Sequence, residues 1–212
     1  MLINHVFTQG MTPTTVPPPP DWVFQRIIAV GGETGLRYEA SLYGPTTCLL
    51  ISNFPLTCRF MIKPQGKIHP EFISNINDST IRTSLDSYHA EVLPRGFRGS
   101  ESGVKIPDFI VVKATESKDD DRELMVVEIK PSDQSLANSM EQLTTYLEAF
   151  MKKSNSETGE PLFHVLYGLL IAGKKVQLVT FPMDRQMGKS GLLDIDSPPV
   201  QAFLNEIATQ NW

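Results

Sequence analysis

Cysteine is scarce in this chain of 212 residues, which contains only Cys48 and Cys58. The two cysteines form no CxxC pair, and no histidine stands near them at the spacing of metal ligands. A disulfide-bonded scaffold needs more cysteines, and structural zinc sites draw on four Cys or His ligands, usually at short spacings. Cysteine content therefore indicates neither kind of domain.

Long hydrophobic runs are also missing. A membrane-spanning helix needs roughly 18 or more consecutive apolar residues, whereas the longest apolar candidate in the chain is Leu166–Ala172. The amino terminus lacks a basic region followed by an apolar run, the pattern typical of a secretory signal. We therefore expect no membrane association and an intracellular location, in the cytoplasm or the nucleus.

Positive charge is not in excess, because 19 Lys and Arg residues stand against 24 Asp and Glu residues, for a formal net charge of −5. A general basic coat for binding nucleic acid is therefore not indicated. The four histidines have neither ligand spacing nor an evident nucleophile partner, and no serine lies in a Gly-x-Ser-x-Gly setting. These absences disfavour serine-type and cysteine-type hydrolases.

What the chain does contain is charge inside two strand-like apolar segments. Val104–Val112 and Glu123–Lys130 are nearly continuous in Val, Ile, Leu and Met, which predicts strands covered on both faces. The first contains Asp108, directly after Pro107, and the second ends on Glu128-Ile129-Lys130. The segment between them is polar and turn-prone, so the two strands are predicted to form an antiparallel hairpin.

The period of two along a strand predicts which side chains share a face. Asp108 falls on the face of Ile110 and Val112, and both Glu128 and Lys130 fall on the face of Leu124 and Val126. Pairing in a hairpin would bring the three ionic groups together. Burying unpaired charge is costly, so their coincidence with buried-type strands favours a functional site.

Composition divides the chain into three parts: a flexible proline-rich arm over 1–20, a β-rich extension over 21–66 and a core domain over 67–212. Short apolar segments alternate with turn residues in the extension. They predict an antiparallel meander with strands over Val23–Val30, Leu36–Tyr43, Cys48–Ser52 and Cys58–Lys63. A competing helix over Leu36–Ile51 is disfavoured because Gly44-Pro45 would break it.

The core domain is predicted to begin with a helix between His69 and Leu93. The glycine-rich loop Pro94–Gly103 follows and carries Arg95 and Arg98, which either contact phosphate or are simply solvated. Later elements are read from helical spacing and from apolar runs around Gly173-Lys174-Lys175. They are a helix from Ser132 to Lys153, strands over Phe163–Ala172 and Val176–Phe181, and a terminal helix marked by Val200, Phe203, Leu204 and Ile207.

Pro107-Asp108, a gap, Glu128-Ile129-Lys130 and then a helix resemble the PD-(D/E)XK nuclease superfamily, also called the restriction-endonuclease-like fold. The resemblance covers roughly Asp78–Phe181. It implies an α/β core that runs helix, three-stranded meander, helix, strand, with a mixed central sheet flanked by helices. Here an amino-terminal antiparallel β extension would precede that core. Gln142 and Tyr146 have the QxxxY spacing of the RecB-like branch, which puts both on one helical face.

The resemblance implies a nuclease that depends on Mg²⁺ or Mn²⁺, both of which prefer oxygen ligands. Asp108 and Glu128 would bind the metal, with the carbonyl of Ile129 as a further ligand. Lys130 would orient the attacking water or stabilise negative charge. Gln142 and Tyr146 would form part of the active-site edge, and Arg95 and Arg98 would contact nucleic acid. Many members add an acidic residue from the first helix, for which Glu91 is preferred and the alternatives are Glu71, Asp86 and, if Leu36–Ile51 were helical, Glu39.

Two other interpretations stay open. A catalytically inactive module of the same fold would bind nucleic acid or a protein partner. In an unrelated structural domain, Asp108 would only mark the entry to a strand, and Glu128 and Lys130 would form an ion pair on one strand face. The sequence does not decide between DNA and RNA, or whether the chain forms a homodimer.

Overall fold

The computed structural model describes residues 17–32, 40–65, 107–116, 121–131, 135–158, 165–182 and 186–212. The helix predicted between His69 and Leu93 and the loop Pro94–Gly103 lie outside the described residues. The same holds for six of the candidate residues named above. They are Arg95, Arg98, Glu91, Glu71, Asp86 and Glu39.

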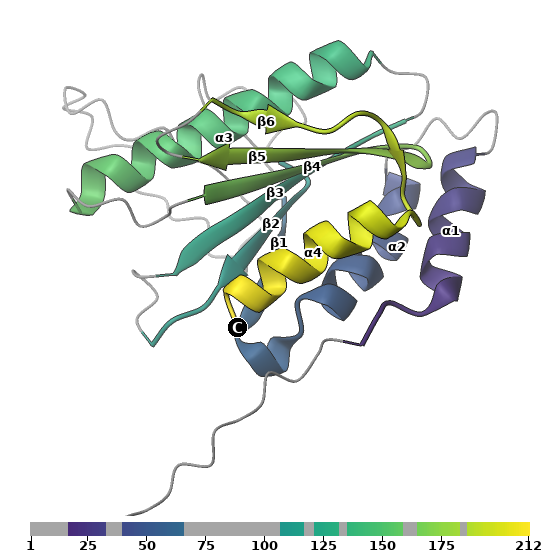
Figure 1. Cartoon of the computed structure of the whole chain (residues 1–212), viewed down its shortest axis with the longest axis horizontal. Helices are drawn as coiled ribbons and strands as arrows, with labels where there is room; N and C mark the ends of the chain where they lie inside the picture. The colour runs from purple at the N-terminus through teal and green to yellow at the C-terminus, as the bar shows by residue number, and fades with distance from the viewer. Residues whose placement is uncertain are drawn as a thin grey trace, which may run out of the picture.

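A mixed β-sheet forms the centre of the protein (Figure 1). In the described part of the chain its seven strands are β1 (Phe60–Pro64), β2 (Phe109–Lys113), β3 (Arg122–Lys130), β4 (Val165–Ala172), β5 (Lys175–Pro182), β6 (Gly188–Lys189) and β7 (Leu193–Asp194). The strand order is β1-β2-β3-β4-β5-β6, and β7 pairs with β5. Only β3 and β4 run parallel among these pairs, so the sheet is open and mixed, which confirms the predicted α/β class.

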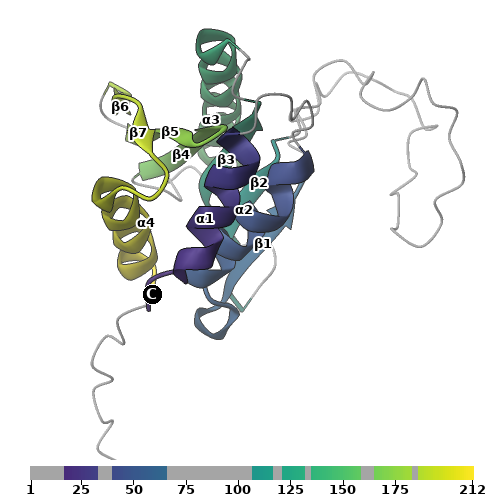
Figure 2. The ribbon, with the colours of Figure 1, turned by 90° about the vertical axis from the view of Figure 1, so that its right-hand side faces the viewer.

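Helices cover both faces of this sheet (Figure 2). The described helices are α1 (Asp21–Gly32), α2 (Ala40–Asn53), α3 (Leu136–Thr158) and α4 (Pro198–Gln210). On one face, here called the α3 face, Leu143 and Leu147 of α3 cluster with Ile110 and Val126 of the sheet. The other face, here called the α2 face, is covered by α1, α2 and α4 and buries residues such as Phe109. Each face therefore has its own hydrophobic cluster.

β3 confirms the predicted strand Glu123–Lys130, whereas the predicted strand Val104–Val112 is confirmed only from Phe109 onward, because Pro107 and Asp108 precede β2. β2 and β3 form the predicted antiparallel hairpin, and β4 and β5 form a second one. Seven of the eight residues of β4 are buried, as expected for a strand covered on both faces. Gly173 turns the second hairpin with φ of 59°, a left-handed conformation that glycine adopts without strain.

The helix predicted after Lys130 is confirmed as α3, and it provides the crossover that the parallel pair β3 and β4 requires. Its buried residues include Met140, Leu143, Leu147 and Phe150, the spacing predicted from sequence. Both predicted bounds are wrong, because the helix begins at Leu136 and not at Ser132, and it continues past Lys153 to Thr158. Lysines favour a helix carboxyl end but do not stop the chain, and the next helix breakers in the sequence come after Thr158.

The antiparallel meander predicted over 21–66 is wrong, since Asp21–Gly32 and Ala40–Asn53 are helices and, among the described residues of this stretch, only Phe60–Pro64 is a strand. Pro45 lies inside α2, where proline costs about 3 kcal/mol. Leu42, Leu49 and Leu50 of α2 are almost fully buried, and each contributes about 1.5–3 kcal/mol. Burial against the sheet therefore outweighs the proline penalty, and the helix continues through it.

The elements before the central hairpin share the core of the main sheet rather than a separate β layer. β1 pairs with β2 along its whole length, from Phe60 opposite Lys113 to Pro64 opposite Phe109. Side chains of α1 and α2, such as Ile27 and Leu49, pack in one cluster with Phe109 and Val127. Pro19, at the end of the predicted proline-rich arm, is also buried.

Gly31 is the next-to-last residue of α1 and fixes where that helix lies. A Cβ atom at Gly31 would come within 2.4 Å of the Gly173 carbonyl carbon in the β4–β5 turn. Since real Cβ contacts are never that short, only glycine allows α1 to approach this hairpin. The helix end and the turn are therefore in direct backbone contact.

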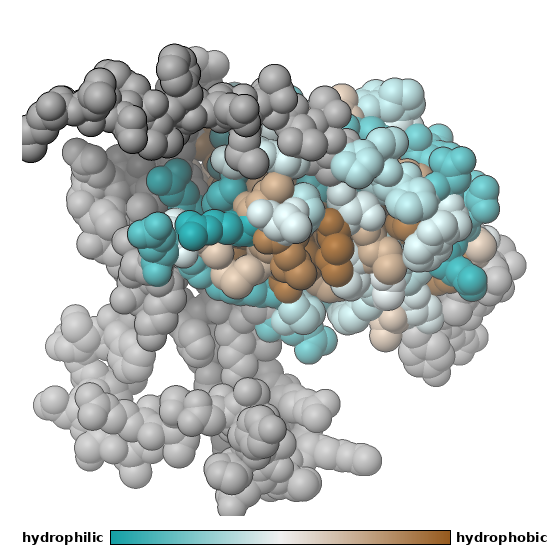
Figure 3. Space-filling model, turned by 90° about the horizontal axis from the view of Figure 1, so that it is seen from below, coloured by the Kyte–Doolittle hydropathy of each residue, from teal (hydrophilic) through white to brown (hydrophobic). Residues whose placement is uncertain are grey.

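One face of the molecule shows hydrophobic side chains within a largely hydrophilic surface (Figure 3). Among the described residues, the exposed large hydrophobic side chains are Trp22, Ile51, Leu56, Leu192 and Trp212. They come from different elements, and isolated exposed apolar side chains are normal on folded domains. They define no site by themselves.

Candidate active site

The structure brings Asp108 and Glu128 together at one end of the β2–β3 hairpin. The register pairs Phe109 with Val127, and continuing it by one position sets Asp108 opposite Glu128. Val126 belongs to the cluster under α3, so the alternation of β3 points Glu128 toward the α3 face. The charges of Asp108 and Glu128 both act on Tyr146 of α3. Asp108 is 7% exposed and Glu128 is 1% exposed, which makes them the buried carboxylates of the described chain.

One part of the predicted strand face is wrong. Leu124 was expected on the same face as Val126, but it packs in the cluster of the α2 face. The β2–β3 register shifts between Val111 and Val112, so that Val111 pairs with Met125 and Val112 with Glu123. Leu124 is therefore the extra residue of a β-bulge, which reverses the faces of the β3 side chains that precede it. Glu128 and Lys130 come after the bulge and keep the predicted face.

Both carboxylate oxygens of Asp108 accept hydrogen bonds from the protein. The Tyr43 hydroxyl of α2 donates to Oδ1, and the backbone N–H of Ile129 donates to Oδ2 at 2.6 Å. The Asp108 carbonyl accepts from the N–H of Gln65 at 2.7 Å, which ties the start of β2 to the end of β1. Asp108 is thus anchored from three separate segments, and each bond to an ionised oxygen is of the stronger, charge-assisted kind.

Glu128 forms a buried ion pair with Lys130. Lys130 Nζ lies 2.6 Å from Glu128 Oε1, and the two side chains are 13% and 2% exposed. The pair is two residues apart on β3, so both side chains share the α3 face. A buried ion pair contributes little net stability, because desolvation offsets the attraction.

Gln142 and Tyr146 of α3 complete the group. Gln142 Nε2 donates to the Tyr146 hydroxyl oxygen at 2.5 Å. Burial raises the pKa of Tyr146, the hydrogen bond from Gln142 lowers it, and the nearby charges of Glu128, Lys130 and Asp108 act on it as well. Tyr146 is therefore within electrostatic range of all three ionic groups and keeps its proton at neutral pH.

The described part of the chain does not include the candidates for the acidic residue expected from a first helix. Within the described ranges, no three His, Cys, Asp or Glu side chains group in a way that could hold a metal ion. Glu91 and its alternatives lie outside those ranges, as do Arg95 and Arg98. Glu39 is an alternative only if Leu36–Ile51 is helical, and that condition is met in part because α2 is helical from Ala40 onward.

The oxygen atoms at this end of the hairpin are of the type that binds Mg²⁺ or Mn²⁺. Mg²⁺ is commonly held by one or two carboxylates together with water and substrate phosphate, and Asp108 and Glu128 supply two carboxylates. The Ile129 N–H points to Asp108, and in an extended strand the C=O of a residue faces the same neighbour as its N–H. The Ile129 carbonyl therefore also faces the Asp108 side. All these donors are oxygens, the ligand type of Mg²⁺ and Mn²⁺.

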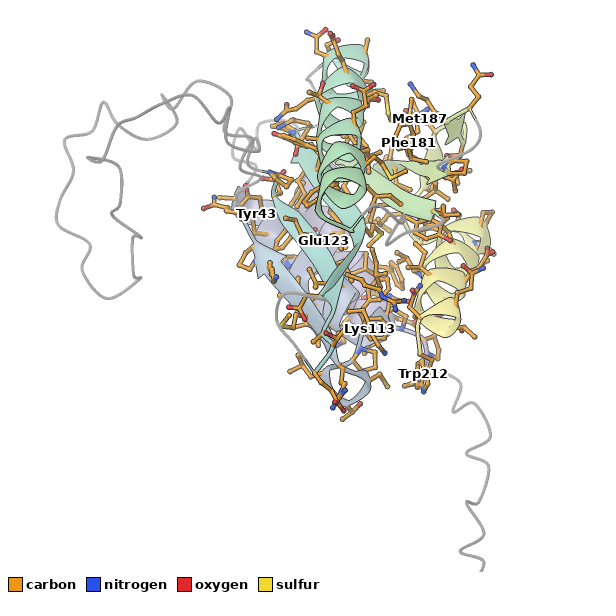
Figure 4. The ribbon with its side chains drawn as sticks, turned by 90° about the vertical axis from the view of Figure 1, so that its left-hand side faces the viewer. Tyr43, Lys113, Glu123, Phe181, Met187 and Trp212 are labelled. Carbon is orange, nitrogen blue, oxygen red and sulfur yellow. The ribbon has the colours of Figure 1, made fainter. Side chains whose placement is uncertain are left out.

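Sequence reasoning missed Tyr43. It was assigned to a strand that ends at Tyr43, before Gly44-Pro45, whereas it lies in the first half of α2. Figure 4 shows Tyr43 at one end of the sheet and Lys113 toward the opposite end. Helical spacing of the buried residues Leu42, Thr46, Leu49 and Asn53 was the available signal for α2. No local pattern links Tyr43 to Asp108, 65 positions later.

Comparison of the chain with protein-family models, with curated proteins and with solved structures finds no match. None of the helices in the described ranges has the length and apolar character needed to cross a membrane.

Proposed function

We propose that the chain is a metal-dependent nuclease that hydrolyses phosphodiester bonds of nucleic acid. The observation that carries the proposal is the pair of buried carboxylates, Asp108 and Glu128, which meets the Lys130 amine at one end of a hairpin. Such a group matches the motif that Pro107-Asp108 and Glu128-Ile129-Lys130 resemble. Mg²⁺ or Mn²⁺ is the cofactor and DNA or RNA the partner in this proposal.

The order of the elements supports a restriction-endonuclease-like core. That core is implied to run helix, three-stranded meander, helix, strand. In the chain, α2 precedes the antiparallel strands β1, β2 and β3, then α3 leads to β4, which is parallel to β3. In this arrangement α2 takes the place of the first helix, which the sequence had assigned to the segment between His69 and Leu93.

The roles of the residues follow from their contacts. A metal bound by Asp108 and Glu128 would neutralise a phosphate oxygen and lower the pKa of an attacking water. Lys130 holds Glu128 and presents an ammonium group to the charge that develops on the phosphate. Tyr146 keeps its proton and accepts a hydrogen bond from Gln142, so these two side chains of α3 would contribute polar groups at the edge of the site.

The second candidate is a catalytically inactive module of the same fold that binds nucleic acid or protein. It is favoured by the lack of a third acidic group beside Asp108 and Glu128 within the described ranges. Intracellular location is part of the proposal for either function.

The experiment that separates them is cleavage of circular single-stranded DNA, circular duplex DNA and RNA in Mn²⁺, Mg²⁺ or EDTA. Wild type, Glu128→Gln and the control Glu123→Gln are compared on a gel. Glu123 lies on the same strand, near its start, whereas Glu128 lies near its end. Cleavage by wild type and E123Q that is lost in E128Q and in EDTA supports the nuclease. A folded wild type that cleaves none of the substrates favours the inactive module.

A further inference from the structure

Tyr43 lies outside the motif, and in the described part of the chain it contacts Asp108, one of the two proposed metal ligands. Its hydroxyl donates to Asp108 Oδ1, and its ring packs edge-on against Phe109, with centroids 5.4 Å apart and planes at 71°. Tyr43 belongs to α2, which covers the face of the sheet opposite α3. Its hydroxyl nevertheless contacts Asp108, the buried carboxylate beside Glu128. One side chain therefore connects α2 to the candidate site.

We propose that Tyr43 is a positioning residue that orients Asp108 for binding of the divalent cation, so that the α2 helix takes part in forming the metal site. This inference rests on the proposed function, because it assigns a partner to one of the carboxylates named there. It goes beyond that function in giving the site a component from α2.

The hydrogen-bond geometry of Asp108 explains how such positioning works. A carboxylate has two oxygens and about four lone-pair positions. The Ile129 N–H occupies one on Oδ2 and the Tyr43 O–H occupies one on Oδ1. Two donors on different oxygens restrict the rotation of the carboxylate plane, so loss of the Tyr43 bond removes one of these two restraints.

Residues that hydrogen-bond to a metal-binding side chain orient it, and their loss typically lowers metal affinity 10–100-fold. Tyr43→Phe removes the hydroxyl but keeps the ring that packs on Phe109. The variant therefore tests the hydrogen bond with little change in packing. We expect it to bind Mn²⁺ about tenfold or more weakly than wild type.

Tyr167→Phe is a matched control. The Tyr167 hydroxyl donates to Gln210 Oε1 at 2.9 Å, and its ring packs edge-on against Phe203, with centroids 5.6 Å apart. Y167F therefore also removes one hydroxyl bond and keeps an edge-on aromatic contact, but on β4, away from the carboxylates. Thermal unfolding of both variants reports the stability effect that they share.

The experiment is calorimetric titration of Mn²⁺ into the full chain without nucleic acid, for wild type, Y43F, Y167F and Asp108→Asn. Weaker binding in Y43F, unchanged binding in Y167F and no binding in D108N support the proposal. In cleavage assays, Y43F should then recover the wild-type rate when Mn²⁺ is raised, because the defect is in metal binding and not in kcat.

If Y43F binds Mn²⁺ with wild-type affinity, or if Y167F loses as much Mn²⁺ affinity as Y43F, the positioning role of Tyr43 is overturned. In either case, loss of Mn²⁺ binding in D108N would still support the metal site itself. If wild type binds no Mn²⁺, the proposed function fails, and the role of Tyr43 fails with it. These two failures are distinguished by the wild-type and D108N titrations.

Discussion

Lys113 and Lys130 occupy the same position in neighbouring strands, since each is the last residue of its strand. Because β2 and β3 are antiparallel, the two lysines lie at opposite ends of the hairpin. Lys113 Nζ donates to the Cys58 carbonyl at 2.7 Å and lies 4.6 Å from the centre of the Phe60 ring. Lys130 Nζ instead contacts the buried carboxylate of Glu128 at 2.6 Å.

The partners of the two lysines distinguish a structural role from a chemical one. A carbonyl oxygen and an aromatic ring are structural partners, and they explain why Lys113 is half-buried without any reaction. A buried carboxylate beside a second buried carboxylate is a poor way to gain stability and a good way to bind a cation. In the proposed function, the Asp108 end of the hairpin is therefore the functional end, and the Lys113 end joins β2 to the chain before β1.

The largest effect is expected from removing a carboxylate at the functional end. Asp108→Asn or Glu128→Gln should lower cleavage by on the order of 10³-fold or more, because metal assistance supplies several kcal/mol and each 1.4 kcal/mol is about tenfold. EDTA should have the same effect on wild type. The rate of appearance of cut circular DNA measures it. Equal rates for wild type and E128Q would contradict the assignment of the site.

The two lysines can be compared directly by Lys130→Met and Lys113→Met. K130M should lower cleavage by on the order of 10²-fold, the usual cost of removing one group that stabilises developing charge. Its Mn²⁺ affinity should stay equal or increase, because a competing cation beside Glu128 is gone. K113M should cleave at the wild-type rate and lose about 1–2 kcal/mol of stability with its hydrogen bond. A loss of cleavage in K113M as large as that in K130M would remove the distinction between the two ends.

A smaller effect is expected from the α3 pair beside Lys130. Gln142→Leu removes the hydrogen bond that Tyr146 accepts at 2.5 Å, so the Tyr146 hydroxyl is less firmly oriented. We expect a decrease in kcat of about tenfold or less, consistent with one neutral hydrogen bond of about 1 kcal/mol. Glu148→Gln, an exposed substitution on the same helix, serves as control and should have no effect. A kcat of Q142L equal to that of wild type would leave Gln142 outside the site.

The smallest effect concerns the pH dependence of stability at the Lys113 end. Burial lowers the pKa of Lys113 below its ordinary value of 10.5, the Cys58 thiol raises it and Arg59 lowers it. The unfolded chain then binds more protons than the folded chain between the lowered pKa and 10.5, so the free energy of unfolding rises with pH in that window. K113M should lack this rise. Identical pH profiles of urea unfolding for wild type and K113M would show that Lys113 is not desolvated.

The central part of the fold was predictable because each element has a strong local pattern. The apolar runs around Asp108 and Glu128 and the helical spacing of Leu143 and Leu147 gave β2, β3 and α3. The proximity of Asp108, Glu128 and Lys130 then followed from strand alternation and hairpin pairing.

The remainder depends on tertiary contacts that no local pattern records. Gly44-Pro45 favours a break, and burial of the leucines in α2 overrides it. The bulge that turns Leu124 to the α2 face depends on pairing with Val111 and Val112. Tyr43 reaches Asp108 only because α2 packs beside the start of β2.

The most direct test of the account is the number of Mn²⁺ ions bound by wild type, Glu128→Gln and Glu123→Gln in equilibrium dialysis. Both variants change one carboxylate of β3 to an amide, one at each end of the strand. The account predicts that wild type and E123Q bind Mn²⁺ equally and that E128Q loses the site. Equal binding by E128Q and wild type, or no binding by a folded wild type, would contradict it.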